Sequence, residues 1–275
     1  HALSTLSPHE RAAGVVAASA GNHALGLAYH GGLLGIKVTV VMPVTAPQVK
    51  VDRCRGLGAE VVLHGPTFDA ADGFAREWAA RVGANYVHPF DDLRVIAGQG
   101  TLAWEIREQT PELDTLVVPV GGGGLLAGVA VTVKALRPDV RVVGVEPEHA
   151  AGFLAACLRG EPGTTALLPT LADGLAVAQV GRNTFAAAAP LIDDLVTVTE
   201  AELARGMAVL ARGCGIVAEG AGAAAVAALV AGKVRGRACV LPITGRNVDP
   251  ALHAQVVAQR GQPGSAALAV EARAA

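Results

Sequence analysis

Three features of this sequence predict an α/β fold built mainly on parallel sheets. Short runs rich in Val, Leu and Ile alternate with Ala-rich stretches of helical length along most of the 275 residues. The short runs are continuously apolar, as expected of strands that are buried on both faces of a sheet. Two of them lead directly into glycine-containing turns that are followed by helices. A repeated strand–helix order favours helices packed on parallel sheets.

The apolar runs and the helical stretches can be placed in order along the chain. Strands are expected at residues 14–17, 38–42, 60–63, 85–87, 115–120, 141–146, 195–198 and 237–243. Helices are expected at residues 21–34, 46–57, 68–81, 95–109, 125–136, 200–212 and 222–229. Thr199 and Glu202 form a capping-box pattern that starts one of these helices. The Gly-, Ala- and Pro-rich end, residues 262–275, is expected to fray.

Composition excludes several classes of function. A net charge of −2 argues against a basic nucleic-acid-binding surface, and 52% apolar residues argue against disorder. The 55 Ala and 34 Gly residues fit close packing of helices on sheets, although a codon bias would produce the same excess. The four cysteines are far apart in sequence, which fits reduced thiols in a cytoplasmic protein. The uncharged stretches 12–36 and 116–133 contain residues that do not suit a membrane-spanning helix, so no membrane partner is expected.

A run of four glycines, Gly121–Gly124, separates the expected strand 115–120 from the expected helix 125–136. Glycines at this place let backbone N–H groups converge on an anion at the helix N-terminus, and phosphate is the natural ligand. One alternative is a tight strand-to-helix turn that binds nothing. The segment therefore predicts a phosphate site without identifying the molecule that carries the phosphate.

A dinucleotide is a second possible ligand of this segment. Gly122, Gly124 and Ala127 satisfy the GxGxxA pattern, and Glu146 follows about twenty residues later, near the end of the next strand. In a dinucleotide-binding fold that carboxylate would contact the ribose. The glycine run alone does not distinguish this ligand from a single phosphate group.

A second turn follows the first expected strand. Ser19, Ala20, Gly21, Asn22 and His23 lie where this strand passes into a helix, so polar side chains and backbone N–H groups face one point. The alternative interpretation is ordinary capping of the helix by Ser19 or Asn22.

The run Ser19-Ala-Gly-Asn-His-Ala24 resembles the signature of the threonine/serine dehydratases, which are pyridoxal-phosphate enzymes of fold type II. Similar segments follow in the family's order: Gly35-Ile-Lys-Val-Thr-Val-Val-Met-Pro43, Leu57-Gly-Ala-Glu-Val-Val-Leu-His-Gly65, His88-Pro-Phe-Asp-Asp92, Ala97-Gly-Gln-Gly-Thr101, Gly121–Leu125, Glu219-Gly-Ala-Gly-Ala-Ala224 and Ile243-Thr-Gly-Arg-Asn-Val-Asp249. The resemblance covers residues 9–257 and extends to the serine racemases. Cysteine synthases and tryptophan synthase β fit less well at these segments.

The resemblance implies a tryptophan synthase β-like fold with two doubly wound parallel-sheet domains. Residues 14–91 would form the small domain, and residues 1–13 with 92–275 would form the large, cofactor-binding domain. The implied activity is pyridoxal-phosphate-dependent β-elimination. L-Threonine, L-serine or a related β-hydroxy amino acid would lose water and ammonia and give a 2-oxo acid. The family is commonly homodimeric.

The resemblance also implies roles for individual residues. Asn22 would bond the cofactor's ring hydroxyl, and Thr244 would meet the pyridine nitrogen where the family usually has Ser. The cofactor's phosphate would lie against Gly121, Gly122, Gly123, Gly124 and Leu125. The substrate carboxylate would lie against the N–H groups of Ser19, Ala20, Gly21, Asn22 and His23. A neutral hydroxyl at Thr244 favours β-elimination over chemistry that needs a strong electron sink.

Ser19 and Glu219 are the candidate catalytic side chains in this chain. Glu219 matches an acidic position at the edge of the family's active site, and its alternative is an exposed acid at a helix start, favoured by the helix dipole. The racemases have a second Ser after the position of Ser19, where this sequence has Ala20. We therefore expect poor racemisation.

A cation site is implied at Glu146 and the carbonyl of Ala150. The family's third ligand is an acid, and this sequence has Gly152 at that position. Because a hard cation needs about six oxygen ligands, we expect a monovalent or weakly bound divalent cation.

The family's chemistry begins with a lysine that forms a Schiff base with the cofactor, in a segment shortly before the region that begins here at His1. The four lysines, Lys37, Lys50, Lys134 and Lys233, do not match it and are expected to be solvated charges. We therefore expect that the chain is truncated before this lysine and is inactive as this fragment. The rival interpretations are an NAD(P)-binding Rossmann oxidoreductase and a non-catalytic relic of the pyridoxal-phosphate fold.

Overall fold

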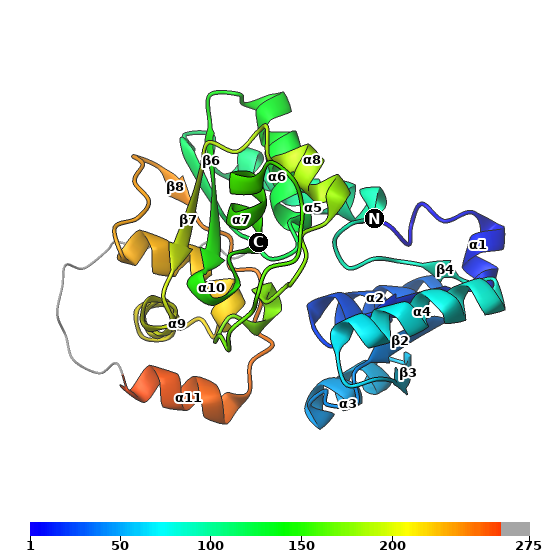
Figure 1. Cartoon of the computed structure of the whole chain (residues 1–275). Coiled ribbons are helices and arrows are strands. Elements are labelled where there is room, and N and C mark those ends of the chain that lie inside the picture. Colours follow the sequence, from blue (N-terminus) through cyan, green and yellow to red (C-terminus); the bar gives the residue numbers. More distant parts are fainter. Residues whose placement is uncertain (260–275) are drawn as a thin grey trace. The chain divides into compact units, whose positions relative to one another are not determined.

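A computed structural model describes residues 1–259, which fold as two compact units, residues 1–98 and residue 99 onward (Figure 1). The expected fraying at residues 262–275 lies outside the described residues. The division expected from the sequence, with residues 1–13 and 92–275 in the cofactor-binding domain, stays a prediction.

The first unit is built on a four-stranded parallel sheet in the order β3-β2-β1-β4. Its strands are β1 (Val15–Ala18), β2 (Val38–Met42), β3 (Glu60–Leu63) and β4 (Asn85–Tyr86). Its helices are α1 (Pro8–Ala13), α2 (Asn22–Leu34), α3 (Gln48–Gly56) and α4 (Phe68–Val82). One hydrophobic cluster packs Val15, Val40 and Met42 against α2 and α3, and a second packs Val16 and Val41 against α4. The sheet is therefore covered on both faces.

The second unit repeats this arrangement with the strand order β7-β6-β5-β8, again all parallel. Its strands are β5 (Thr115–Pro119), β6 (Arg141–Pro147), β7 (Asp194–Val198) and β8 (Cys239–Val240). Helix α5 (Leu93–Gln109) crosses the division between the units. The later helices are α6 (Gly124–Leu136), α7 (Gly152–Arg159), α8 (Arg182–Ala188), α9 (Glu200–Cys214), α10 (Gly220–Val230) and α11 (Pro250–Gln259), with the short 3₁₀ turns η1 (Glu148–Ala150) and η2 (Asp173–Leu175).

The two sheets share one topological feature that bears on function. In the first unit the chain moves outward from β1 through β2 to β3, and β4 then pairs on the other side of β1. In the second unit β5, β6 and β7 follow the same course, and β8 pairs on the other side of β5. Ligands of open parallel sheets bind at the carboxyl ends of the two strands where the order reverses. These places lie after β1 and β4, and after β5 and β8.

The sequence predicted the regular elements well. All eight strands and all seven helices are confirmed, with β8 shorter than expected. Four short helices (α1, α7, α8 and α11) and the two 3₁₀ turns were not predicted. The expectation that every strand is buried on both faces is wrong for the four edge strands β3, β4, β7 and β8, whose residues are mostly half-buried or exposed. An edge strand has a neighbouring strand on one side only, which leaves its residues more exposed.

The small residues have a packing role in α10. Nine of its eleven residues, Gly220–Ala228, are buried, and this helix packs against α9. A Cβ atom at Gly206 of α9 would lie 3.0 Å from the Ala223 carbonyl oxygen of α10. Side chains larger than Ala would force these helices apart, so the Ala and Gly excess is partly structural.

The other expectations from composition can be compared with residues 1–259. All four cysteines in this part are free thiols. None of the helices described here has both the length and the apolar content needed to cross a membrane.

Candidate functional site

The turn after β1 presents backbone donors at the start of α2. The Ser19 N–H donates to the Val41 carbonyl in the sheet, and the Gly21 N–H donates to Ser19 Oγ at 3.1 Å. Gly21 is the N-cap of α2, and no side chain caps this helix. Capping by Ser19 or Asn22 is therefore wrong as an account of this turn. A helix start without a side-chain acceptor is suited to an anion.

This arrangement limits which donors a bound carboxylate could use. Of the five predicted carboxylate-binding residues, Ser19 and Gly21 already use their N–H groups within the protein. Ala20 and His23 are half-buried, and Asn22 is exposed. The side chain of Asn22 is therefore accessible from solvent, as its predicted role requires.

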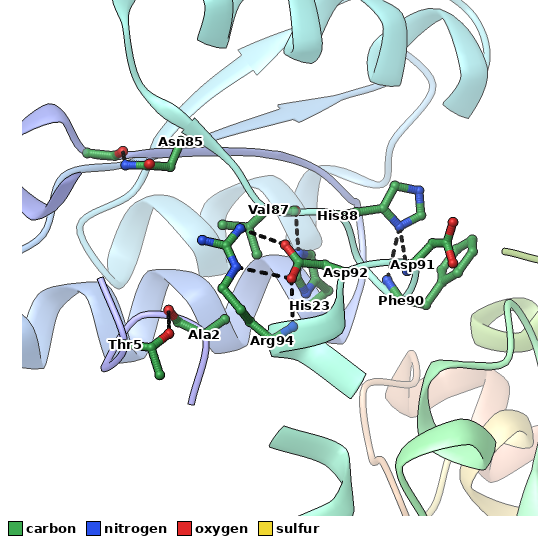
Figure 2. A network of polar contacts seen from close by, with 11 residues as sticks. Ala2, Thr5, His23, Asn85, Val87, His88, Phe90, Asp91, Asp92 and Arg94 are labelled. Carbon is green, nitrogen blue, oxygen red and sulfur yellow. Dashed lines mark hydrogen bonds and ion pairs between the residues drawn. The ribbon is translucent and has the colours of Figure 1, made fainter. Parts of the chain in front are cut away.

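The segment after β4 lies against the turn after β1. His23 Nε2 lies 3.1 Å from the Val87 carbonyl oxygen (Figure 2). His88 Nδ1 accepts hydrogen bonds from the N–H groups of Phe90 (3.2 Å) and Asp91 (2.8 Å), which turns the chain after the strand. The run His88-Pro-Phe-Asp-Asp92 thus has a structural function in this turn.

Asp92 ends that turn and starts α5. Its Oδ1 accepts from the Arg94 N–H at 2.8 Å, and its two carboxylate oxygens bond the Arg94 guanidinium at 3.1 and 2.7 Å (Figure 2). These bonds lower the pKa of Asp92 even though burial opposes the change. The carboxylate is therefore ionised and fixed.

Burial lowers the pKa of His23 to about 4, and the bond to the Val87 carbonyl only partly opposes this. Burial also lowers the pKa of His88. Both imidazoles are therefore neutral near pH 7, and neither supplies a positive charge to this part of the molecule.

The glycine run of the second unit forms the start of α6, after β5. Gly123 is the N-cap, with φ of 92°, and no side chain caps the helix. A Cβ atom at Gly123 would lie 2.9 Å from Phe153 Cε2 and 2.9 Å from Thr184 Oγ1. At Gly121 a Cβ atom would lie 3.0 Å from Leu175 Cα. The glycines are therefore required by close packing as well as by backbone conformation.

Thr184 supports this loop and was not predicted from the sequence. It is fully buried, and its Oγ1 donates to the Gly122 carbonyl oxygen at 2.7 Å, with the Gly181 carbonyl oxygen at 3.0 Å. The Gly122 carbonyl is thereby turned toward α8, away from an anion at the helix start. No local pattern around Thr184 signals this long-range contact.

The loop after β8 carries Thr244, which is exposed. The Glu219 N–H donates to the Gly245 carbonyl oxygen at 3.1 Å, and a Cβ atom at Gly222 would lie 2.6 Å from the same oxygen. The glycines of α10 therefore allow its first turn to contact this loop. Glu219 is the N-cap residue of α10 and is buried, so the alternative of an exposed acid is wrong.

Glu146 is fully buried at the end of β6. Its Oε1 accepts from the Phe153 N–H at 2.7 Å and its Oε2 accepts from the Leu154 N–H at 2.8 Å, so the carboxyl group caps α7. Burial raises its pKa to about 7, against the effect of these two bonds. A side chain held in this way does not reach a ribose, which argues against the dinucleotide interpretation. Within residues 1–259 no group of three His, Cys, Asp or Glu side chains could hold a metal ion.

The lysines show one error of the sequence prediction. Lys37 is a surface ion-pair partner of Glu60, as expected. Lys134 is instead mostly buried, and its Nζ bonds Asp193 at 2.7 Å and the Val140 carbonyl at 2.8 Å. Lys233 bonds Glu202 at 2.6 Å. Lys134 and Lys233 both connect neighbouring elements of the second unit, and Lys233 is exposed, as expected of a solvated charge.

The two parallel-sheet units and their glycine-lined helix starts define a fold-type-II, tryptophan synthase β-like protein. The family model described as "Pyridoxal-phosphate dependent enzyme" matches residues 1–245, so the chain belongs to this family. Pyridoxal phosphate is the family's cofactor, and the helix start after Gly123, which packing keeps free of side chains, fits its phosphate group.

Individual relatives show which branch of the family is similar. The chain is 45% identical over 248 residues to an L-threonine ammonia-lyase of Thermotoga maritima; the match covers 90% of this chain and 62% of that protein. A threonine deaminase isoform 2 from Solanum lycopersicum aligns with a TM-score of 0.88 and 39% identity, over 94% of this chain and 77% of that one. A serine racemase from Dictyostelium discoideum aligns with a TM-score of 0.82 and 34% identity, over 90% and 81%. The chain spans less than two thirds of the Thermotoga relative's length.

Proposed function

We propose that this chain belongs to a pyridoxal-phosphate-dependent ammonia-lyase. The enzyme would convert L-threonine, L-serine or a related β-hydroxy amino acid to a 2-oxo acid and ammonia. The observation that carries the proposal is that the uncapped starts of α2 and α6 follow the inner strands β1 and β5, where the strand order reverses. The names of the similar proteins support the reaction class.

The cofactor, when bound, supplies an electron sink for removing the substrate's Cα proton. The loop before α6 and the start of this helix would hold the phosphate through the backbone of Gly121, Gly122, Gly123, Gly124 and Leu125. Thr244, which is exposed, would meet the pyridine nitrogen with its hydroxyl, and Asn22 would bond the ring hydroxyl. Because Thr244 is neutral, it does not stabilise a protonated ring as a carboxylate would.

The substrate carboxylate lies at the start of α2. Ala20, Asn22 and His23 would contribute most to it, because the N–H groups of Ser19 and Gly21 have partners within the unit. Ser19 Oγ then orients the turn by accepting from Gly21. Ser19 and the buried Glu219 remain the candidate catalytic side chains of this chain.

A panel of β-hydroxy amino acids tests the reaction class. The full-length protein, with any residues that precede His1, is loaded with pyridoxal phosphate and assayed for 2-oxo acid. We expect product from threonine or serine, and little D-serine from L-serine because position 20 is Ala. Absence of 2-oxo acid from every member of the panel, with the cofactor's absorbance band present, would contradict the proposal.

Glu146 and the carbonyl of Ala150 are proposed to bind a monovalent or weakly held divalent cation. Each Glu146 oxygen accepts one backbone bond and retains a further lone pair. Added K⁺ or Mg²⁺ should raise the melting temperature slightly. An equal response in Glu146→Ala would show that the cation does not bind there.

The remaining proposals concern the assembled protein. We propose that the protein is a cytoplasmic homodimer and that it binds a small amino acid as its substrate. We also propose that residues 1–13 and 92–275 form its cofactor-binding domain. Size measurement by light scattering tests the dimer.

A further inference from the structure

A hydrogen bond between His23 and Val87 joins the two segments that follow β1 and β4. These strands pair directly, and the chain leaves them in different directions, toward α2 and toward α5. Within the first unit, His23 in the first turn of α2 reaches the Val87 carbonyl just beyond β4 at 3.1 Å (Figure 2). This contact lies where the topology predicts that a ligand binds.

Val87 is held from two sides. Its N–H donates to the Val16 carbonyl at 2.9 Å, which continues the pairing of β4 with β1. Its carbonyl accepts from His23, and its side chain is buried. The pairing of the strands thus fixes the N–H of Val87, and His23 fixes its carbonyl group.

The chemistry of the contact defines the state of the imidazole. A carbonyl oxygen only accepts, so Nε2 of His23 carries the proton and donates it. His88 and Asp92 are the titratable groups that act on His23, and their effects on it oppose each other. A neutral ring donates this bond without placing a charge beside the α2 helix start.

The residues after Val87 continue the constraint. His88 Nδ1 holds the Phe90 and Asp91 N–H groups, and Asp92 starts α5 through Arg94. Successive hydrogen bonds therefore hold residues 87–94 in place, and His23 connects this segment to α2 (Figure 2).

We infer that His23 is a positioning residue. Its side chain holds residues 87–92 beside the turn Ser19–His23, so that the backbone donors of this turn keep one orientation toward the substrate carboxylate. The inference rests on the proposed function, which places the carboxylate there. It adds a function for the imidazole that is separate from the backbone N–H of the same residue.

Hydrogen exchange tests the positioning without using activity. In the full-length protein, His23→Leu should speed exchange of the Phe90 and Asp91 amides by roughly 5- to 10-fold, the effect expected from loss of one hydrogen bond. His23→Gln, whose amide also donates, should stay within about 2-fold of the wild type. His30→Leu is the matched control, because His30 is exposed on the same helix. In His30→Leu, the Phe90 and Asp91 amides should exchange as in the wild type.

Kinetics distinguish positioning from simple destabilisation. His23→Leu should raise KM for the amino acid by roughly 5- to 10-fold with kcat changed less, and His23→Gln should restore most of the loss. A lower kcat at constant KM, or equal exchange in the Leu variant and the wild type, would overturn the inference. If His23→Leu does not fold, His23→Asn replaces it, since the shorter amide does not reach Val87. Failure of both to fold would make the role structural and also overturn the inference.

The two proposals fail in different ways. If the wild type forms no 2-oxo acid, the proposed reaction is wrong, and the exchange comparison in the protein without substrate still decides whether His23 positions residues 87–92. If the wild type is active and exchange is unchanged in His23→Leu, only the positioning role is wrong.

Discussion

Two separate constraints, the backbone conformation and the close packing around the residue, both require glycine at position 123. The φ of 92° at Gly123 disfavours any residue with a Cβ atom, and that atom would also lie 2.9 Å from Phe153 and from Thr184. Gly160 has a similar φ of 81°, but a Cβ atom there would have no neighbour within 4 Å. Comparing substitutions at Gly123 and Gly160 therefore distinguishes the cost of backbone strain from the cost of steric conflict.

Gly123→Ala should destabilise the protein by about 3 kcal/mol, and Gly160→Ala by about 1 kcal/mol, since only the first adds a close contact in a packed site. Urea unfolding measures both. Gly123→Ala should also weaken binding of pyridoxamine 5′-phosphate, which has the cofactor's phosphate but forms no covalent bond with lysine. Equal losses of stability in the two variants would show that packing around Gly123 is not tight.

Thr184 gives a second prediction for the same loop. Thr184→Val keeps the shape of the side chain but removes the hydroxyl that donates to the Gly122 carbonyl. Because that carbonyl is buried, the loss should be about 1–3 kcal/mol. Thr184→Ser keeps the hydroxyl and serves as the control for it. If Thr184→Val and Thr184→Ser destabilise the protein equally in urea unfolding, the hydrogen bond to Gly122 is not the main contribution of Thr184 to stability.

Among the elements, the contact between α9 and α10 depends on glycine. Gly206→Ala would place a methyl group 3.0 Å from the Ala223 carbonyl and from the Ala227 nitrogen, so we expect a loss of about 1–3 kcal/mol. Gly213→Ala lies on the same helix with no neighbour within 4 Å, and should stabilise by up to about 1 kcal/mol through helix propensity. Thermal unfolding of both variants checks the opposite signs. Stabilisation by Gly206→Ala would contradict the close approach of the helices.

The elements also show what the sequence could and could not predict. The strands β1, β2, β5 and β6 are continuous apolar runs, and their bounds follow from that pattern. α7 and α8 are short and Ala-rich, without a side-chain N-cap of their own, so no local signal marks their starts. α7 is capped instead by Glu146, a residue that precedes the helix by six positions.

The candidate site shows the same division. Local sequence patterns predicted the glycine run and the Ser19–His23 turn as sites, and the resemblance to the dehydratases predicted Thr244. The ligand-binding roles of all three stay predictions. Thr184 and the His23–Val87 bond were not predicted, since each joins residues more than sixty positions apart. The burial of Lys134 was missed for the same reason, because its partner Asp193 lies 59 positions away in the sequence.

At the scale of the whole molecule, each unit contains a titratable group whose pKa is shifted strongly by burial, and the two responses to pH have opposite sign. His23, in the first unit, has a pKa of about 4, below its ordinary 6.5, because of burial. Its contribution to stability is complete above pH 6.5 and is lost as the pH falls from 6.5 to 4. Glu146, in the second unit, has a pKa of about 7, above its ordinary 4.5, also because of burial. Its contribution is complete below pH 4.5 and is lost as the pH rises from 4.5 to 7.

Between pH 4.5 and 6.5 the two units should therefore change stability in opposite directions. Amide protection factors, which divide out the intrinsic exchange rate, should rise with pH for β1 and α2 and fall for β6 and α7. Each full contribution is on the order of 3 kcal/mol. His23→Gln should weaken the first trend alone, because His88, whose pKa burial also lowers, remains, and Glu146→Gln should flatten the second alone, so each variant is the control for the other. If both trends persist in both variants, the pH response comes from other groups. If only one trend disappears in its own variant, only that residue carries the linkage.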